Sequence, residues 1–173
     1  MERREELEER RCAAIWRRVA PDLDPYPEER AARVSAAGMS EETLRAALEA
    51  ALGARRDYLA YARRTGGSTG RALEELARRT GQELRRLRGI YYLLTGACWE
   101  RQTACDGTEA VGLCAVLRGR YAAETGCAAR FEGWAAAAED PCLGGVLRHL
   151  AEESRSRAAV VLKLLENRLA QQG

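Results

Sequence analysis

Apolar residues recur every three or four positions in four long segments of the chain, and this spacing is typical of amphipathic helices. The predicted helices cover residues 40–64, 69–95 and 109–138, and the fourth begins at 140. The strong helix formers Ala, Leu, Arg and Glu dominate these segments. The pattern therefore predicts an all-α fold, and four amphipathic helices of roughly 25–30 residues predict a four-helix bundle.

Residues at the predicted helix ends support these boundaries. Ser40 and Asp140 are good N-cap residues, and Pro141 suits the first helical position. Glycines at 66–67 and at 96 are typical of helix ends. The short connections predict two antiparallel pairs, the first helix with the second and the third with the fourth.

The link between the two predicted pairs is long. It runs from Gly96 to Thr108, which is 13 residues, and an extended chain of that length reaches about 45 Å. The second predicted helix is about 40 Å long at about 1.5 Å per residue. The link is therefore long enough to cross from one end of the bundle to the other.

A shorter helical region precedes the bundle. Segments 2–19 and 28–38 predict short helices, and the prolines of the sequence PDLDPYPEE between them interrupt any longer one. We therefore expect two parts, an N-terminal helical extension (residues 1–39) and the bundle (residues 40–173).

Composition and charge exclude several classes of protein. Hydrophobic residues make up 46% and charged residues 31%, so wholesale disorder is not expected. The net charge is only +2 and both signs are interleaved, which argues against nucleic acid as a partner. The chain has no apolar run long enough for a membrane span and begins with charged residues, so we expect a cytoplasmic protein without a membrane partner. The six cysteines are then expected to be reduced, and without a CxxC pair a zinc ribbon is not expected.

Five stretches of the chain resemble the rubrerythrin-related, ferritin-like proteins of anaerobic bacteria, and together they cover most of its length. The stretches are IWRRVAPDLDPYP, DYLAYARRTGG, ELRRLRGIYYLLTGACW, LRGRYAAETGCAARF and DPCLGGVLRHLAEESRSRAAVVLKLLENRL. The resemblance implies a ferritin-like four-helix bundle with a long crossover. It also implies a carboxylate-bridged pair of metal ions, usually iron, in which each helix pair supplies a lone Glu and a Glu-x-x-His.

Most of the ligands implied by the resemblance are replaced in this sequence. Of six expected positions, only Glu124 is unchanged, and Glu83 replaces a His with a carboxylate. The only histidine, His149, falls one residue off the inward face, where we expect a partly exposed side chain. The residues at the six positions are Ala51, Thr80, Glu83, Glu124, Ser154 and Arg157.

Charged residues nevertheless occupy inward positions at the height in the bundle where the resemblance implies the metal ligands. We expect Arg157 to lie between Glu83 and Glu124 and to take over the role of the metal ions, because a guanidinium binds carboxylates through paired hydrogen bonds. The alternative is that Arg157 extends outward and Glu83 faces solvent at the edge of the bundle. Three tyrosines were candidates for further hydrogen bonds to this cluster: Tyr58, Tyr91 and Tyr121.

Three functions remain open from the sequence. The favoured one is a structural or interaction module that has lost its metals, has no cofactor or catalytic residue, and is a possible homo-oligomer. The second is a metal-binding oxidoreductase, peroxidase or iron-binding protein of the rubrerythrin class, which would use Glu83 and Glu124 with iron or other divalent metals. The third is a thiol-based redox module built on Cys98 and Cys105 of the link, whereas Cys114 and Cys127 are interpreted as small buried side chains. No protein partner can be named from the sequence.

Overall fold

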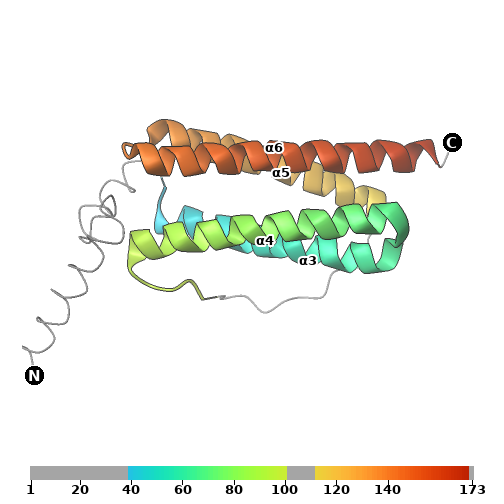
Figure 1. Cartoon of the computed structure of the whole chain (residues 1–173), viewed down its shortest axis with the longest axis horizontal. Coiled ribbons are helices and arrows are strands. Elements are labelled where there is room, and N and C mark those ends of the chain that lie inside the picture. The colour runs from blue at the N-terminus through green and yellow to red at the C-terminus, as the bar shows by residue number, and fades with distance from the viewer. Residues whose placement is uncertain (1–38, 101–111, 172–173) are drawn as a thin grey trace, which may run out of the picture.

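A computed structural model describes residues 39–100 and 112–171, and these residues form two antiparallel helical hairpins (Figure 1). The first hairpin consists of α3 (Glu41–Thr65) and α4 (Gly67–Thr95), and the second of α5 (Leu113–Ala137) and α6 (Pro141–Ala170). Within the described ranges there is no strand, which confirms the all-α prediction. The predicted N-terminal helices and residues 101–111 of the link lie outside the described residues.

The helix ends follow from local chemistry. The side chain of Ser40 accepts a hydrogen bond from the backbone N–H of Thr43 at 3.2 Å, and that of Asp140 accepts one from Cys142 at 2.8 Å. Gly66 and Gly96 end α3 and α4 with φ of 63° and 71°, a region that favours glycine. Helices α3 and α4 therefore begin and end close to their predicted positions, and α6 begins close to its predicted start.

The predicted start of the third helix was wrong. The helix begins at Leu113, and Gly112 immediately before it has an extended backbone with φ −64° and ψ 145°. A continuous helix from residue 109 is therefore excluded, because a residue with this ψ leaves the helical path.

The hairpins pack against each other through the pairs α4–α6 and α3–α5. Helix α4 ends and α5 begins at opposite ends of the bundle (Figure 1). The two hairpins are thus placed as a crossover connection requires, with each helix antiparallel to the two helices that it contacts.

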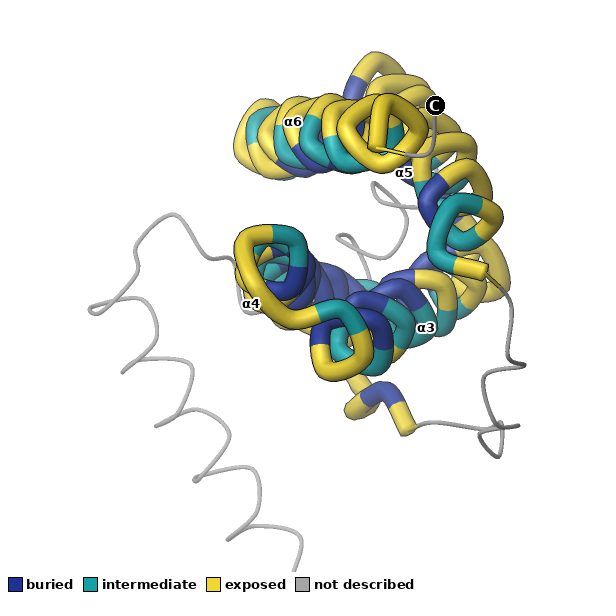
Figure 2. The backbone as a smooth tube through the Cα atoms, turned by 90° about the vertical axis from the view of Figure 1, so that its right-hand side faces the viewer, coloured by how far each residue is buried: buried dark blue, intermediate teal, exposed yellow. Residues whose placement is uncertain are grey.

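The core consists of two apolar clusters with a polar layer between them. Figure 2 shows the buried residues on the faces that the helices turn toward one another. The polar layer contains the buried polar and charged residues of the described chain: Thr80, Glu83, Glu124, Ser154 and Arg157. The cluster on one side of it includes Leu48, Leu87, Trp99, Phe131, Trp134 and Leu150, and the cluster on the other side includes Tyr58, Leu73, Leu76, Leu117 and Val161.

Tyr121, one of the three candidate tyrosines, does not face the core, so this candidate was wrong. Tyr121 is 38% exposed, whereas Leu117, Glu124, Ala128 and Phe131 of the same helix are buried. Three residues of an α-helix make about 300°, so Tyr121 lies about 60° around the helix from Glu124. The contact face of α5 is narrower than the sequence pattern indicated.

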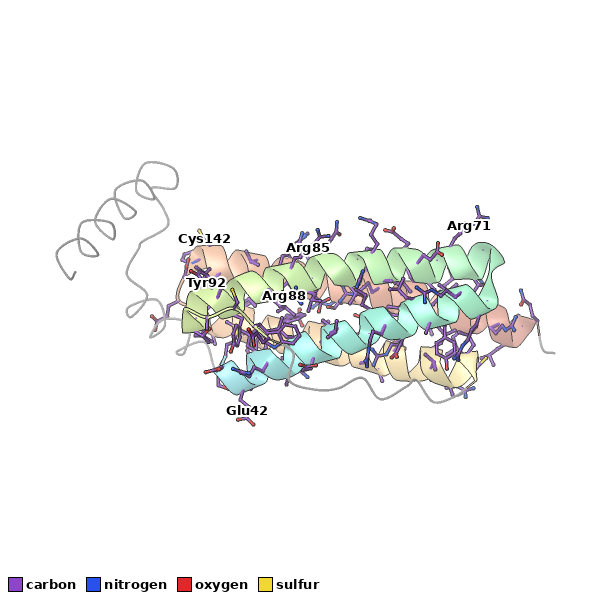
Figure 3. All side chains as sticks on the ribbon, turned by 90° about the horizontal axis from the view of Figure 1, so that it is seen from below. Glu42, Arg71, Arg85, Arg88, Tyr92 and Cys142 are labelled. Atoms are coloured by element: carbon purple, nitrogen blue, oxygen red, sulfur yellow. The ribbon has the colours of Figure 1, made fainter. Side chains whose placement is uncertain are left out.

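Charged residues cover the outer faces of the bundle. Glu42, Arg71 and Arg85 point away from the helices (Figure 3), whereas the guanidinium of Arg88 lies over the ring of Trp99, 5.1 Å from its centroid. In the part of the chain that is described, no helix combines the length and the apolar character needed to cross a membrane.

Candidate functional site

The middle of the bundle contains three buried charged side chains from three different helices. Glu83 lies on α4, Glu124 on α5 and Arg157 on α6, and their exposed fractions are 2%, 5% and 1%. We call these residues the charge cluster. The prediction that Arg157 is buried between two carboxylates is confirmed, and the alternative of a solvent-facing Arg157 and Glu83 is excluded.

Arg157 and Glu124 form the best-defined pair of the charge cluster. The Nε–H of Arg157 donates a hydrogen bond to Oε2 of Glu124 at 2.9 Å, and Nη2 lies at 2.9 Å from the same oxygen. Hydrogen bonds between ionised groups are stronger than neutral ones, and the low polarity of the interior strengthens them further. This pair holds α5 and α6 together at the centre of the second hairpin.

The same guanidinium also binds the first hairpin. Its Nη2 donates to Oε2 of Glu83 on α4 and, at 3.0 Å, to the hydroxyl of Ser154 one turn earlier on α6. The Ser154 hydroxyl in turn donates to the backbone carbonyl of Leu150 at 3.0 Å. Ser154 stands at a position where the resemblance implied a metal ligand, and here it orients Arg157 instead.

Tyr58 connects α3, the remaining helix of the bundle, to the charge cluster. Its hydroxyl donates to Oε1 of Glu124 at 2.9 Å, so both carboxylate oxygens of Glu124 have a partner. Burial, together with the charge of Glu124, raises the pKa of Tyr58 well above its usual range, so this tyrosine stays a hydrogen-bond donor. Of the three candidate tyrosines, only Tyr58 binds the cluster. The hydroxyl of Tyr91 donates to Glu41 at 2.9 Å near the end of the bundle, and Tyr121 is exposed.

Burial and charge act in opposite directions on the pKa values of Glu83 and Arg157. Burial raises the pKa of Glu83 to about 7, although the nearby Arg157 opposes the shift. Burial lowers the pKa of Arg157, but the carboxylates of Glu83 and Glu124 more than offset this effect, and its pKa is raised. The guanidinium therefore stays charged, whereas burial favours the protonated form of the Glu83 carboxyl.

Further polar pairs join the hairpins beside the cluster. Arg86 on α4 lies 2.6 Å from Glu153 on α6, and Arg79 on α4 donates to the Ser156 hydroxyl on α6 at 2.9 Å. On the other side, Arg120 of α5 lies 3.7 Å from Asp57 of α3. The sequence pattern did not predict these pairs, because each lies beside the inward face of its helix. Opposite charge was the available signal for the two ion pairs, Arg86 with Glu153 and Arg120 with Asp57.

The residues at this level do not fit a pair of metal ions. Two of the expected ligand positions carry Ala51 and Thr80, and the Thr80 hydroxyl donates to the Leu76 carbonyl at 2.9 Å. A guanidinium points at the two remaining carboxylates and would repel a cation placed between them. Among the described residues, no group of three or more His, Cys, Asp or Glu side chains is arranged to hold a metal ion.

The histidine lies outside the cluster. The side chain of His149 is 53% exposed and lies 3.3 Å from Glu153, which confirms the expectation of a partly exposed residue.

The cysteines do not form a common site in the described chain. Cys127 is partly buried near Glu83 and Glu124, and burial raises the pKa of its thiol, so the reactive thiolate is disfavoured. Cys114 is partly buried and Cys98 is exposed, while Cys105 lies outside the described residues. The third alternative, a redox module built on Cys98 and Cys105, is therefore not tested by the described residues.

A small cavity adjoins the charge cluster. Its volume is about 30 Å³, and it lies where alanines of α3 and α5 face Glu83, Glu124 and Arg157. In the sequence, the signal for this cavity is the small side chains at positions 50, 51 and 54, which reduce packing in the middle of α3.

Comparison with known proteins gives no match. No family model fits the sequence, and no curated protein or solved structure is significantly similar to it.

Proposed function

We propose that this chain is a ferritin-like bundle of the rubrerythrin type in which an internal ion cluster replaces the paired metals, and that it acts as a structural or interaction module rather than as an enzyme. The observation that carries the proposal is the position of Arg157 between Glu83 and Glu124 in the centre of the bundle. A cation is required there because two buried carboxylates without a counter-charge would be strongly destabilised.

The contacts of Arg157 support a structural role for the cluster. Through Glu83, Glu124 and Tyr58, the hydrogen-bonded network includes residues from all four helices. A buried network with specific partners favours one register of the helices over others, since a slip would leave charges unpaired. In a metalloprotein of this type, coordination of two ions by four helices would have the same effect.

The arrangement of the hairpins supports the ferritin-like part of the proposal. Helices α4 and α5 run in the same direction, and the end of one and the start of the other lie at opposite ends of the bundle (Figure 1). One long crossover between two antiparallel pairs is the connection found in ferritin-like folds.

The proposal is tested by counting metals. The full chain is expressed in medium supplied with iron, manganese and zinc, and metal per chain is measured by elemental analysis. We expect a content far below one metal ion per chain and no turnover of hydrogen peroxide after reconstitution with ferrous iron. Two metal ions per chain, or peroxide turnover that is lost in Glu124→Gln, would show that the metal site is functional and would refute the proposal.

A further inference from the structure

Arginine side chains from two helices meet on the outer surface of α4. Nε of Arg55 on α3 lies 3.3 Å from the point that a Cβ atom on Gly81 would occupy, and Nε of Arg85 donates a hydrogen bond to the backbone carbonyl of Gly81 at 3.3 Å. Arg88 follows one turn later, and its guanidinium lies over the ring of Trp99. These three arginines are exposed, and we call Arg55, Arg85 and Arg88 the arginine face.

No carboxylate within residues 39–100 and 112–171 neutralises the arginine face. Arg78, two turns before Arg85, pairs with Glu75, and Arg86, on the side of α4 that faces α6, pairs with Glu153. The three members of the arginine face form no such ion pair with the described chain. Like charges that converge on one glycine repel each other, so carboxylates placed between them would stabilise this surface.

An exposed aromatic ring extends the arginine face toward the end of α4. Tyr92 is 54% exposed and lies one turn after Arg88 (Figure 3). It is seven residues from Arg85, which is about two full turns, so both side chains lie on the same side of the helix. An occupant with both carboxylate and apolar side chains therefore matches this surface.

The chain contains a segment of this composition. Residues 22–29, DLDPYPEE, carry four carboxylates and no basic side chain, and Leu23 and Tyr26 are interspersed among them. The prolines at 25 and 27 are incompatible with a helix interior, so the sequence predicts an extended stretch. We call residues 22–29 the acidic segment, and it lies outside the described residues.

The chain between the acidic segment and the bundle is long enough for the segment to reach the arginine face. It comprises the nine residues 30–38, which extend to about 30 Å. Helix α3 begins beside the C-terminal end of α4, because the hydroxyl of Tyr91 donates to Glu41 at 2.9 Å. From Gly81 to Tyr92, α4 measures only about 17 Å. A short tether also raises the effective concentration of the segment to about the millimolar range.

We propose that the acidic segment binds the arginine face of its own chain. Its carboxylates lie on Arg55, Arg85 and Arg88, and its apolar side chains lie against Tyr92. The contact holds the N-terminal extension on the first hairpin and covers a surface that otherwise attracts acidic partners. Salt screens exposed ionic contacts, so the segment dissociates as the ionic strength rises. The proposal is independent of the charge cluster, which contains none of these residues.

Protection from a protease measures this contact in the full chain. Glutamyl endopeptidase cleaves after Glu28 and Glu29 within the acidic segment and after Glu8 and Glu9 outside it, and mass spectrometry distinguishes the products. The ratio of the two cleavage rates reports on the segment and corrects for the activity of the protease. We expect this ratio to rise when sodium chloride is increased to about 0.5 M. A ratio that does not change with salt would overturn the proposal.

Substitutions test whether the arginine face provides the protection. Arg85→Gln combined with Arg88→Gln should raise the ratio at least about fivefold at low salt, because a loss of about 1 kcal/mol of binding corresponds to such a factor. The matched control is Arg63→Gln combined with Arg64→Gln, which removes the same charge from exposed positions on α3 at the other end of the hairpin. One of the control arginines also lies over an aromatic ring, as Arg88 does. Equal ratios for all three proteins would overturn the proposal.

A double-mutant cycle tests whether the segment and the face bind each other. Asp22→Asn combined with Asp24→Asn removes half of the charge of the acidic segment and retains both cleavage sites. We expect it to raise the ratio, and we expect little further increase when it is combined with the Arg85 and Arg88 substitutions. Effects that multiply independently would overturn the proposal. Protection that grows with protein concentration would place the segment on a second copy and would also overturn it, and circular dichroism verifies that each variant is folded.

Discussion

The guanidinium of Arg157 on α6 is 2.9 Å from Oε2 of Glu124 on α5, in the layer that separates the two apolar clusters of the bundle. The same guanidinium reaches Glu83 on α4, so a single side chain links the two hairpins. Transfer of three charges into the interior is costly, and their mutual attraction repays this cost only while the set is complete. The charge cluster is therefore sensitive to the loss of any one member.

Substitution of Arg157 tests this sensitivity directly. Arg157→Leu removes the counter-charge of two buried carboxylates, and we expect it to lower the free energy of unfolding by roughly 3–5 kcal/mol. The matched control is Arg155→Leu on the same helix, because that side chain is 50% exposed and pairs with an exposed Glu132. An exposed pair contributes at most about 1 kcal/mol. Both values are measured by urea unfolding.

One outcome of the Arg157→Leu experiment would contradict the prediction. If Arg157→Leu changed the free energy of unfolding no more than Arg155→Leu does, Arg157 would not be the counter-charge of the cluster. A triple variant that also carries Glu83→Leu and Glu124→Leu should recover part of the lost stability, since replacement of a whole buried ion set by apolar side chains is often neutral.

Removal of the Tyr58 hydroxyl tests the second partner of Glu124. Tyr58→Phe leaves the buried Oε1 of Glu124 without its 2.9 Å hydrogen bond. Hydrogen bonds to charged groups contribute about 1.5–3 kcal/mol, so we expect a loss of that order in urea unfolding. Tyr121→Phe is the control, because Tyr121 is 38% exposed. This substitution should change the free energy of unfolding by no more than about 0.5 kcal/mol. Equal effects of the two substitutions would argue against the hydrogen bond to Glu124.

Much of the fold and the centre of the site could be predicted from the sequence. Charged residues at 83, 124 and 157 interrupt apolar faces with helical spacing, and a charge on an inward face needs a partner nearby. Helix boundaries at Ser40 and Asp140 were predictable because capping chemistry is local.

Other features depend on how the helices are rotated against each other. The exposure of Tyr121 and the pair between Arg120 and Asp57 depend on angles of a few tens of degrees, which helical spacing alone does not determine. The cavity beside Arg157 depends in addition on the distance between α3 and α5, which the single-sequence pattern does not contain.

The turn between α3 and α4 provides a test of close packing. A Cβ atom on Gly70 would lie 3.0 Å from the carbonyl oxygen of Ala62, whereas a Cβ on Gly89 of the same helix would meet no atom within 4 Å. We expect Gly70→Ala to destabilise the protein by about 1–3 kcal/mol, because a backbone atom must move. Gly89→Ala should stabilise it by about 0.5–1 kcal/mol, since alanine is the better helix former. Thermal unfolding of both variants measures the two effects, and a stabilising Gly70→Ala would contradict the close approach of α3 and α4.

The raised pKa of Glu83 predicts a pH dependence of stability. In the folded protein the pKa is about 7, while the unfolded chain has an ordinary value near 4.5. Between these values the folded state binds more protons than the unfolded state, so the free energy of unfolding falls as the pH rises. Between these two pKa values, ionisation of Glu83 lowers the free energy of unfolding by on the order of 3 kcal/mol, at about 1.4 kcal/mol per pKa unit.

Glu83→Gln removes this titration and keeps an oxygen that accepts a hydrogen bond from Arg157. We therefore expect the stability of the unchanged protein, measured relative to Glu83→Gln by urea unfolding, to fall as the pH rises from about 4.5 to about 7. Exposed acids such as Glu41 and Glu75 have lowered pKa values and stabilise the fold above their unfolded pKa, so their effects appear at lower pH and are the same in both proteins. Glu75→Gln is the matched control and should retain the fall in stability with rising pH. Parallel pH profiles for the unchanged chain and Glu83→Gln would show that Glu83 does not titrate in this range, and that the attraction of Arg157 outweighs burial.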